Sequence, residues 1–216
     1  MISKAYSDFF ATLEVNNNKE WFNDNKKTYE REVKAPFLNL ISDVMDTVGQ
    51  WDPRIEPEPK KSLFRINRDI RFSKDKSPYN TIMKAALAPG GRKSGLPGYY
   101  IGISADTVHV GGGQFDLDTP TLARLCAFLS ENYDELEEII GRKEFKSKFE
   151  HLLGDKVTRL NGPLKDKVAE MPLLLHKQYY AMTRNTDRTQ VSAQELLKSL
   201  AVVRPLVEFL ERGLKS

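Results

Sequence analysis

Apolar side chains recur with a helical period through the first part of the chain. Phe9 and Leu13 mark a short first segment, and after Pro36 apolar residues follow in steps of three and four until Gly49. The apolar positions of this later segment are Phe37, Leu40, Ile41, Val44, Met45 and Val48. Because such steps place side chains on one face of a helix, the pattern predicts a helical entry unit over residues 1–50 with that face buried.

From Ser62 onward, polar and apolar residues alternate in a way that is typical of strands. The expected extended segments are 64–73, 81–89, 98–104, 107–115 and 177–185. The connections within residues 62–115 are too short for helical crossovers, so most neighbouring strands are expected to be antiparallel.

The remainder of the chain is mainly helical by the same criterion, and Thr119 with Pro120 gives a clear helix start. The predicted helices span 117–141, 144–154 and 192–214, and Pro205 is expected to kink or divide the last of them. The sequence therefore predicts an α+β fold with a central, mostly antiparallel sheet and helices at both the N-terminal and C-terminal ends.

A length of 216 residues fits one large domain, so a single domain over 1–216 is expected. Its parts are the helical entry unit 1–50, the sheet 62–115, and residues 119–216 with helices and one further strand. Basic residues number 33 and acidic residues 30, which gives a formal charge of +3. With this balance, any function that depends on positive charge must be local.

Cys126 is the only cysteine, which excludes an intramolecular disulfide and a cysteine-based zinc site. No apolar run approaches the roughly 18 residues that a membrane span requires. We expect a cytoplasmic protein that does not associate with a membrane, and the sequence assigns no oligomeric state.

The predicted strand 64–73 contains the main candidate chemistry. Its alternation places Arg65, Asn67, Asp69 and Arg71 on one face, while Arg68 interrupts the other, apolar face. A guanidinium gives paired hydrogen bonds to phosphate or carboxylate and stays charged at ordinary pH, so this row suits an extended anion. The competing interpretation is a solvated strand face with cross-strand ion pairs.

Arg68 separates these interpretations, because a charge on an apolar face requires either a buried carboxylate or a bound anion. Both remain open, and we hypothesise the bound anion. Lys74 and Lys76 follow in a turn that ends at Tyr79 and would return two further cations to the end of the strand. The candidate ligand-binding residues are Arg65, Asn67, Arg68, Asp69, Arg71, Lys74, Lys76 and Tyr79.

Other motifs are weaker. The glycines of residues 111–113 lack the helix that must follow a phosphate-binding loop, so a tight turn or bulge is expected there. The histidines show no zinc-ligand spacing, and no metal site is predicted. Aromatic and basic residues mix over 18–31, but helical spacing separates a core face from a solvated face, which favours packing over nucleic-acid stacking.

Three groups of residues resemble the motifs of a known family: NNNKEWFNDNKKTYE in the helical part, FRINRDIRFSKDKSPYN at the charged strand, and GYYIGIS with VGGGQF in the sheet. They are similar to the family called domain of unknown function 2461, a conserved hypothetical group of bacteria and fungi. The resemblance extends from about Phe9 to Phe209, and Asn80 replaces the lysine usual in the family. It implies a shared fold, but neither a catalytic residue nor a cofactor.

These observations favour a protein that binds a phosphorylated or carboxylated ligand in an arginine-rich cleft over the sheet. The alternatives are a nucleic-acid-associated protein and an interaction module in which the charged strand is structural. The sequence shows no nucleophile triad and leaves open whether the ligand is turned over. If it is, Asp69 and His109 are the candidate acid–base residues.

Overall fold

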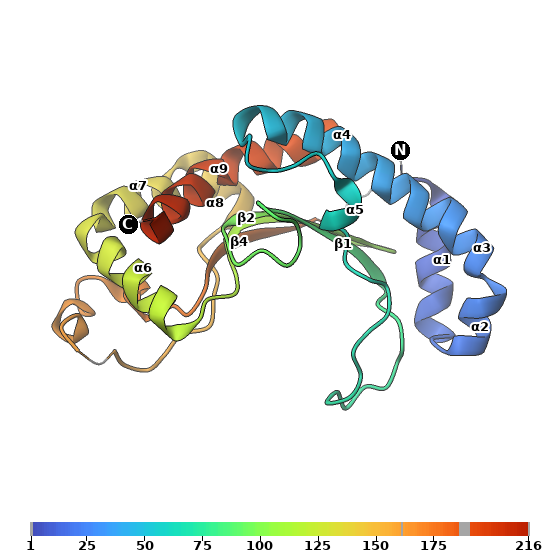
Figure 1. Cartoon of the computed structure of the whole chain (residues 1–216), viewed down its shortest axis with the longest axis horizontal. Helices are drawn as coiled ribbons and strands as arrows, with labels where there is room; N and C mark the ends of the chain where they lie inside the picture. Colours follow the sequence, from blue (N-terminus) through green and yellow to red (C-terminus); the bar gives the residue numbers. More distant parts are fainter. Residues whose placement is uncertain (1, 161, 186–190, 216) are drawn as a thin grey trace. The chain divides into compact units, whose positions relative to one another are not determined.

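The computed structural model describes residues 2–160, 162–185 and 191–215. Two compact units share the chain (Figure 1). The first contains Met1–Arg92, Tyr100–Val110 and Arg184–Leu197, and the second contains Lys93–Tyr99, Gly111–Thr183 and Lys198–Ser216.

Four strands form one antiparallel sheet in the order β1-β2-β3-β4, which confirms the predicted α+β fold class. Their bounds are β1 Ile82–Leu87, β2 Gly98–Ser104, β3 Val108–Gln114 and β4 Tyr179–Asn185. All four coincide closely with predicted segments. Buried and half-buried side chains alternate along β1, as expected for a strand that packs on one face.

The glycines at 111–113 lie inside β3, as the predicted strand 107–115 requires, so the tight turn that was one of the two expectations for them is not formed. A Cβ atom on Gly111 would lie 2.0 Å from the carbonyl oxygen of Ala181, and one on Gly113 would lie 2.2 Å from that of Tyr179. A Cβ atom on Gly112 would come within 3.0 Å of Val203 and Val207. These positions lack side chains because the backbone of the neighbouring strand β4 lies close beside Gly111 and Gly113, and the helix that carries Val203 and Val207 lies close to Gly112.

The N-terminal helices of the first unit are α1 Lys4–Val15, α2 Lys19–Asp24, α3 Lys26–Thr28, the π-helix η1 Tyr29–Lys34, α4 Ala35–Trp51 and α5 Pro59–Ser62. Asn18 caps α2 by accepting a hydrogen bond from the backbone of Trp21 at 2.9 Å. In α4 the four side chains Phe37, Leu40, Ile41 and Val44 are buried, which confirms the predicted phase of this helix.

The second unit contains α6 Thr119–Glu131, α7 Tyr133–Gly141 and α8 Lys143–Phe149, with short 3-10 turns η2 Lys165–Lys167 and η3 Pro172–Leu175. The last helix, α9 Ala193–Lys215, is a single element with Pro205 inside it. Proline therefore does not divide α9. Leu125, Cys126 and Leu129 of α6 are buried, as their helical spacing predicts.

The predicted strand over 64–73 is not formed. Between α5 and β1, only the isolated bridges Leu63–Ala85 and Asn67–Tyr79 pair the backbone. Residues 64–80, which we call the arm, instead form a long two-limbed loop that extends away from β1 (Figure 1). The backbone of Arg68 donates to Pro78 at 2.9 Å, and that of Asn80 donates to Ile66 at 2.7 Å, so the limbs pair only near their base.

Candidate functional site

The base of the arm is held against the N-terminal helices by contacts to Tyr79. The side-chain amide of Asn17 donates to the carbonyl oxygen of Tyr79 at 2.9 Å and accepts from its backbone N–H at 3.0 Å. The ring of Phe22 in α2 stacks on that of Tyr79 with their centroids 4.0 Å apart. The Asn80 side chain in turn donates to the carbonyl oxygen of Ile66 at 3.0 Å, which fixes the other limb.

A hollow of about 670 Å³, which we call the cleft, lies where the arm meets the N-terminal helices. Its lining comes from α2 to α4, from residues 60–67 and from Tyr79, Met83 and Arg92. The lining residues are Phe22, Asn23, Lys26, Tyr29, Glu30, Lys34, Leu38, Lys60, Leu63, Phe64, Arg65, Ile66, Asn67, Tyr79, Met83 and Arg92. All belong to the first unit.

The lining combines an apolar and aromatic part with several cations. Phe22, Tyr29, Tyr79 and Met83 are buried, and the phenol of Tyr29 donates to the sulfur of Met83 at 3.6 Å. Burial raises the pKa of Tyr29, with a smaller contribution from the charge of Glu30. A phenol is neutral at physiological pH even without this shift, and that of Tyr29 acts as a hydrogen-bond donor.

Two of the five lining cations already have protein partners. Lys34 pairs with both carboxylate oxygens of Glu30 at 2.8 and 3.0 Å, and Arg92 donates to the carbonyl oxygen of Lys61 at 3.1 Å. Lys26, Lys60 and Arg65 pair with no carboxylate within the residues that the structure describes. Positive charge therefore exceeds negative charge on this surface.

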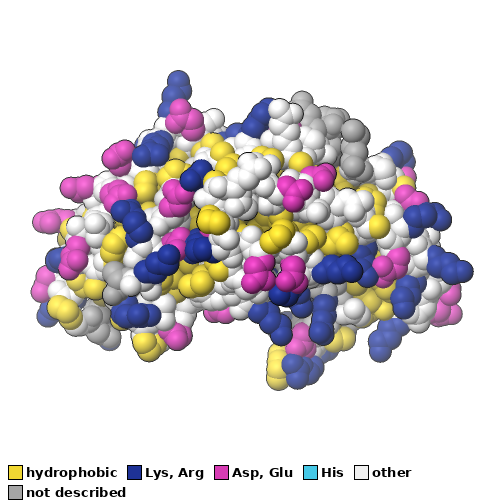
Figure 2. Space-filling model, turned by 45° about the horizontal axis from the view of Figure 1, so that its top comes forward, with side chains coloured by type: hydrophobic (Ala, Val, Ile, Leu, Met, Phe, Trp, Pro, Cys, Tyr) yellow, Lys and Arg dark blue, Asp and Glu magenta, His cyan; other side chains and the backbone are white. Residues whose placement is uncertain are grey.

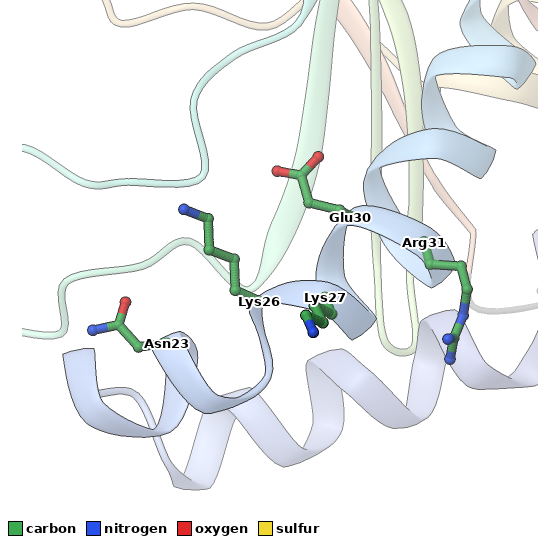
Figure 3. Close-up of a pocket in the computed structure, with 5 residues that line it drawn as sticks. All are labelled: Asn23, Lys26, Lys27, Glu30 and Arg31. Carbon is green, nitrogen blue, oxygen red and sulfur yellow. The ribbon is translucent and has the colours of Figure 1, made fainter.

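A second hollow of about 600 Å³ adjoins the cleft and shares Asn23, Lys26 and Glu30 with it. Figure 3 shows Lys26 and Glu30 projecting to the same side of the α3–η1 segment, whereas Arg31 points away from them. Lys26 thus lies at the junction of the two hollows, where it is exposed to a ligand in either.

Of the predicted ligand-binding residues, Arg65, Asn67 and Tyr79 line the cleft. The others lie in the outer part of the arm, away from this lining: Arg68, Asp69, Arg71, Lys74 and Lys76. The predicted row of side chains with period two is broken because the backbone is not a strand there.

Arg68 has a carboxylate partner. Its guanidinium pairs with Asp75 and donates to the carbonyl oxygen of Ser77 at 3.1 Å, which ties the two limbs together. Hydrogen bonds from Ser77, followed by those from Arg68, lower the pKa of Asp75 below its usual range. The unpaired charge on which the ligand-binding hypothesis for Arg68 depended is therefore not present.

Asp69 accepts hydrogen bonds from Arg71, with Nη2 at 2.6 Å and Nε at 2.9 Å. The side-chain hydrogen bond from Arg71, and then that from its backbone, lower the pKa of Asp69 to about 2. His109 lies in β3, where Nε2 is 3.2 Å from the hydroxyl oxygen of Thr107. Neither candidate acid–base residue lines the cleft.

Sequence reasoning did not select the cleft residues Lys26, Lys34, Lys60 and Arg92. The available signals were the lysine pairs 26–27 and 60–61, but lysines on a helix are most often solvated. Only the packing of the arm against α2 and η1 brings Lys26 to the same surface as Lys60 and Arg65.

In the described part of the chain, no three His, Cys, Asp or Glu side chains are grouped closely enough to hold a metal ion. The helices described here include none with the length and apolar character that crossing a membrane requires.

Comparison with known sequences identifies a family for the chain. No curated protein matches the chain. The model of the conserved hypothetical protein family DUF2461 matches residues 5–209, which include the Asn17 and Tyr79 motifs that meet at the cleft, so the chain belongs to this family.

Proposed function

We propose that the protein binds a phosphorylated or carboxylated small molecule in the cleft. The observation that carries this proposal is the position of Lys26, Lys60 and Arg65 on one lining. Among the described residues, these three cations have neither a carboxylate partner nor the backbone carbonyl partner that Arg92 has. Like charges that share a concave surface repel each other, and a bound anion removes this repulsion. Of the three, the guanidinium of Arg65 is best suited to paired hydrogen bonds with phosphate or carboxylate.

The apolar part of the lining supports a ligand that is more than an inorganic ion. Leu38, Leu63 and Phe64 are partly exposed on the lining, beside the buried aromatic rings. A pocket with apolar walls and a few convergent polar groups is the usual form of a small-molecule site. We expect the anionic group of the ligand at Arg65 and its carbon skeleton against Phe64.

Binding is better supported than acid–base catalysis. Glu30 is the only acidic residue among the described residues of the lining, and it is paired with Lys34. The Tyr29 phenol is neutral at physiological pH, as an ordinary tyrosine is, and burial raises its pKa further. A general base needs an available proton acceptor within reach of the ligand, and neither group provides one in this arrangement.

The outer arm supports a structural role for part of the charged segment. Arg68 with Asp75 and Arg71 with Asp69 are internal ion pairs. The ligand-binding assignment is therefore narrowed to Arg65, Asn67 and Tyr79 of the original candidates, together with Lys26 and Lys60.

The test is the melting temperature in the presence of inorganic pyrophosphate, phosphate or citrate at constant ionic strength. A ligand at 100 times its Kd stabilises by about 2.7 kcal/mol, which corresponds to a rise of roughly 5 to 10 °C for a chain of this size. Arg65→Gln and Lys60→Gln are expected to reduce the rise, and Lys143→Gln, a charge change on α8 outside the cleft, is expected to leave it unchanged. An equal rise in wild type and Arg65→Gln, or none in wild type, would contradict the proposal.

A further inference from the structure

The end of the arm exposes an aromatic ring. Phe72 is 96% exposed, the largest value among the exposed large hydrophobic side chains of the described chain. The guanidinium of Arg71 lies 5.8 Å from the centroid of this ring. Figure 2 shows a projection at the lower edge of the molecule, in the place of the arm in Figure 1, where hydrophobic and basic side chains lie together.

Internal bonds fix the backbone around this ring. Residues 69–76, which we call the tip, are crossed by the hydrogen bond from Lys76 Nζ to the carbonyl oxygen of Ile70 at 3.0 Å. Asp69 accepts from both the side chain and the backbone of Arg71. Phe72 is therefore held in water by a bonded loop, although its burial would contribute about 1.5 to 3 kcal/mol. A side chain held in this way is available to a partner.

The charge of the arm defines the kind of partner. Arg65, Arg68, Arg71, Lys74 and Lys76 are opposed only by Asp69 and Asp75 within residues 64–80. The arm therefore has a net charge of +3, which equals the net charge of the whole chain. The rest of the protein has equal numbers of basic and acidic side chains. An exposed ring between cations matches a polyanion whose repeating units have flat faces.

We propose that the tip binds single-stranded nucleic acid, with a base stacked on Phe72 and phosphates bound by Arg71 and Lys74. The hydrogen bonds of Arg71 to Asp69 use Nε, Nη2 and the backbone N–H, which leaves Nη1 for a phosphate oxygen. Lys74 is exposed. The site is separate from the cleft, because neither Phe72 nor Arg71 belongs to its lining.

Energetics favours a single strand over a duplex. Stacking of one base on one aromatic side chain contributes about 1 to 3 kcal/mol. Opening a step in a duplex costs a few kcal/mol, so one ring does not provide a net gain there. A base in a single strand has its faces available without this cost.

The backbone of the tip argues against a membrane as the partner. Residues 69–76 have no helix or strand, so their backbone N–H and C=O groups would lose water in the hydrocarbon region without regular pairing. A base stacked on Phe72 leaves these groups and the Asp69 carboxylate in water.

The experiment measures fluorescence anisotropy of a fluorescein-labelled 12-nucleotide oligothymidylate with the full chain. Wild type is expected to bind, and its affinity should decrease with salt, each phosphate contact contributing about 0.7 to the logarithmic slope. Phe72→Leu keeps an apolar side chain but removes the aromatic face, so we expect affinity to fall by about 5- to 150-fold. Phe72→Trp is expected to retain or improve it.

Phe115→Leu is the matched control, because Phe115 is another exposed ring at 64% but lies outside the arm. It should bind like wild type, and all variants should melt like wild type because the changed side chains are exposed. Equal affinity of Phe72→Leu and wild type would overturn the proposal, as would equal affinity for a duplex of the same length. Absence of oligonucleotide binding at 50 mM salt would also overturn it, whether or not phosphatidylserine vesicles bind the tip.

Discussion

The side-chain amide of Asn17 binds both backbone polar groups of Tyr79, a residue 62 positions later in the chain. Tyr79 is buried, so its backbone N–H and C=O have little access to water. One side chain thus replaces the backbone pairing that a neighbouring strand would supply. This contact connects the asparagine run after α1 to the arm and positions the limb that faces Arg65.

Asn17→Ala removes a donor and an acceptor from two buried backbone groups. We expect the free energy of unfolding, measured by urea denaturation, to fall by about 1 to 3 kcal/mol. The N–H and C=O of Tyr79 would then be buried without the hydrogen bonds that offset their loss of contact with water. Asn17→Asp keeps the acceptor for the Tyr79 N–H and should lose less than the alanine variant. Wild-type stability of Asn17→Ala would show that water replaces the amide.

Arg68→Met tests whether the Arg68–Asp75 pair is structural. The two side chains are 25% and 60% exposed, and pairs with this degree of exposure contribute little to stability because water screens them. We expect a small decrease in melting temperature and an unchanged response to added pyrophosphate, in contrast to Arg65→Gln. Loss of the pyrophosphate response in Arg68→Met would restore the hypothesis that Arg68 binds the ligand.

His176 is expected to make stability dependent on pH. Its ring is buried, and this burial, followed by the charge of Lys156, lowers the pKa of His176. Below about pH 6.5, His176 is protonated in the unfolded chain but still neutral in the folded chain. The contribution of His176 to the free energy of unfolding is therefore complete above this pH and decreases as the pH falls.

The measurement is the melting temperature at pH 7.5 and 5.5 for His176→Gln and His151→Gln. His151 is exposed, and its charge is the smallest of the contributions to the lowered pKa of His176. Its variant should therefore keep most of the wild-type decrease, whereas His176→Gln should show a much smaller one. An identical decrease in both variants would assign the pH dependence to other groups.

Gly111→Ala tests the close approach of β3 to β4. The added Cβ would lie 2.0 Å from the carbonyl oxygen of Ala181 and 3.0 Å from the Cα of Met182, both of which are backbone atoms. We expect a loss of about 1 to 3 kcal/mol or more in the free energy of unfolding, because the strands must separate to accept it.

Gly141→Ala is the matched control for this substitution. A Cβ at Gly141 would meet no atom within 4 Å. The free energy of unfolding of the Gly141→Ala variant should therefore differ from that of wild type by no more than about 0.5 kcal/mol. Equal effects of the two substitutions would contradict the packing explanation for the glycine run.

The sequence alone determined the helices and strands whose side-chain period repeats over several turns or pleats. The steps of three and four in α4 predicted which side chains are buried, because the period of a helix is a local property of the backbone. Alternation and short connections likewise predicted β1 to β3 as antiparallel neighbours. Of the candidate site, the sequence indicated Arg65, Asn67 and Tyr79.

Tertiary structure alone decided the state of the arm and the composition of the cleft. Residues 64–73 alternate like a strand, but strand formation needs a neighbouring backbone along its length, and the structure supplies pairing only at Leu63 and Asn67. Local ion pairs such as Arg68 with Asp75 take its place in the outer arm. Lys26, Lys60 and Arg65 share a surface only because Asn17 and Phe22 hold Tyr79, and no local pattern encodes contacts between residues so far apart in sequence.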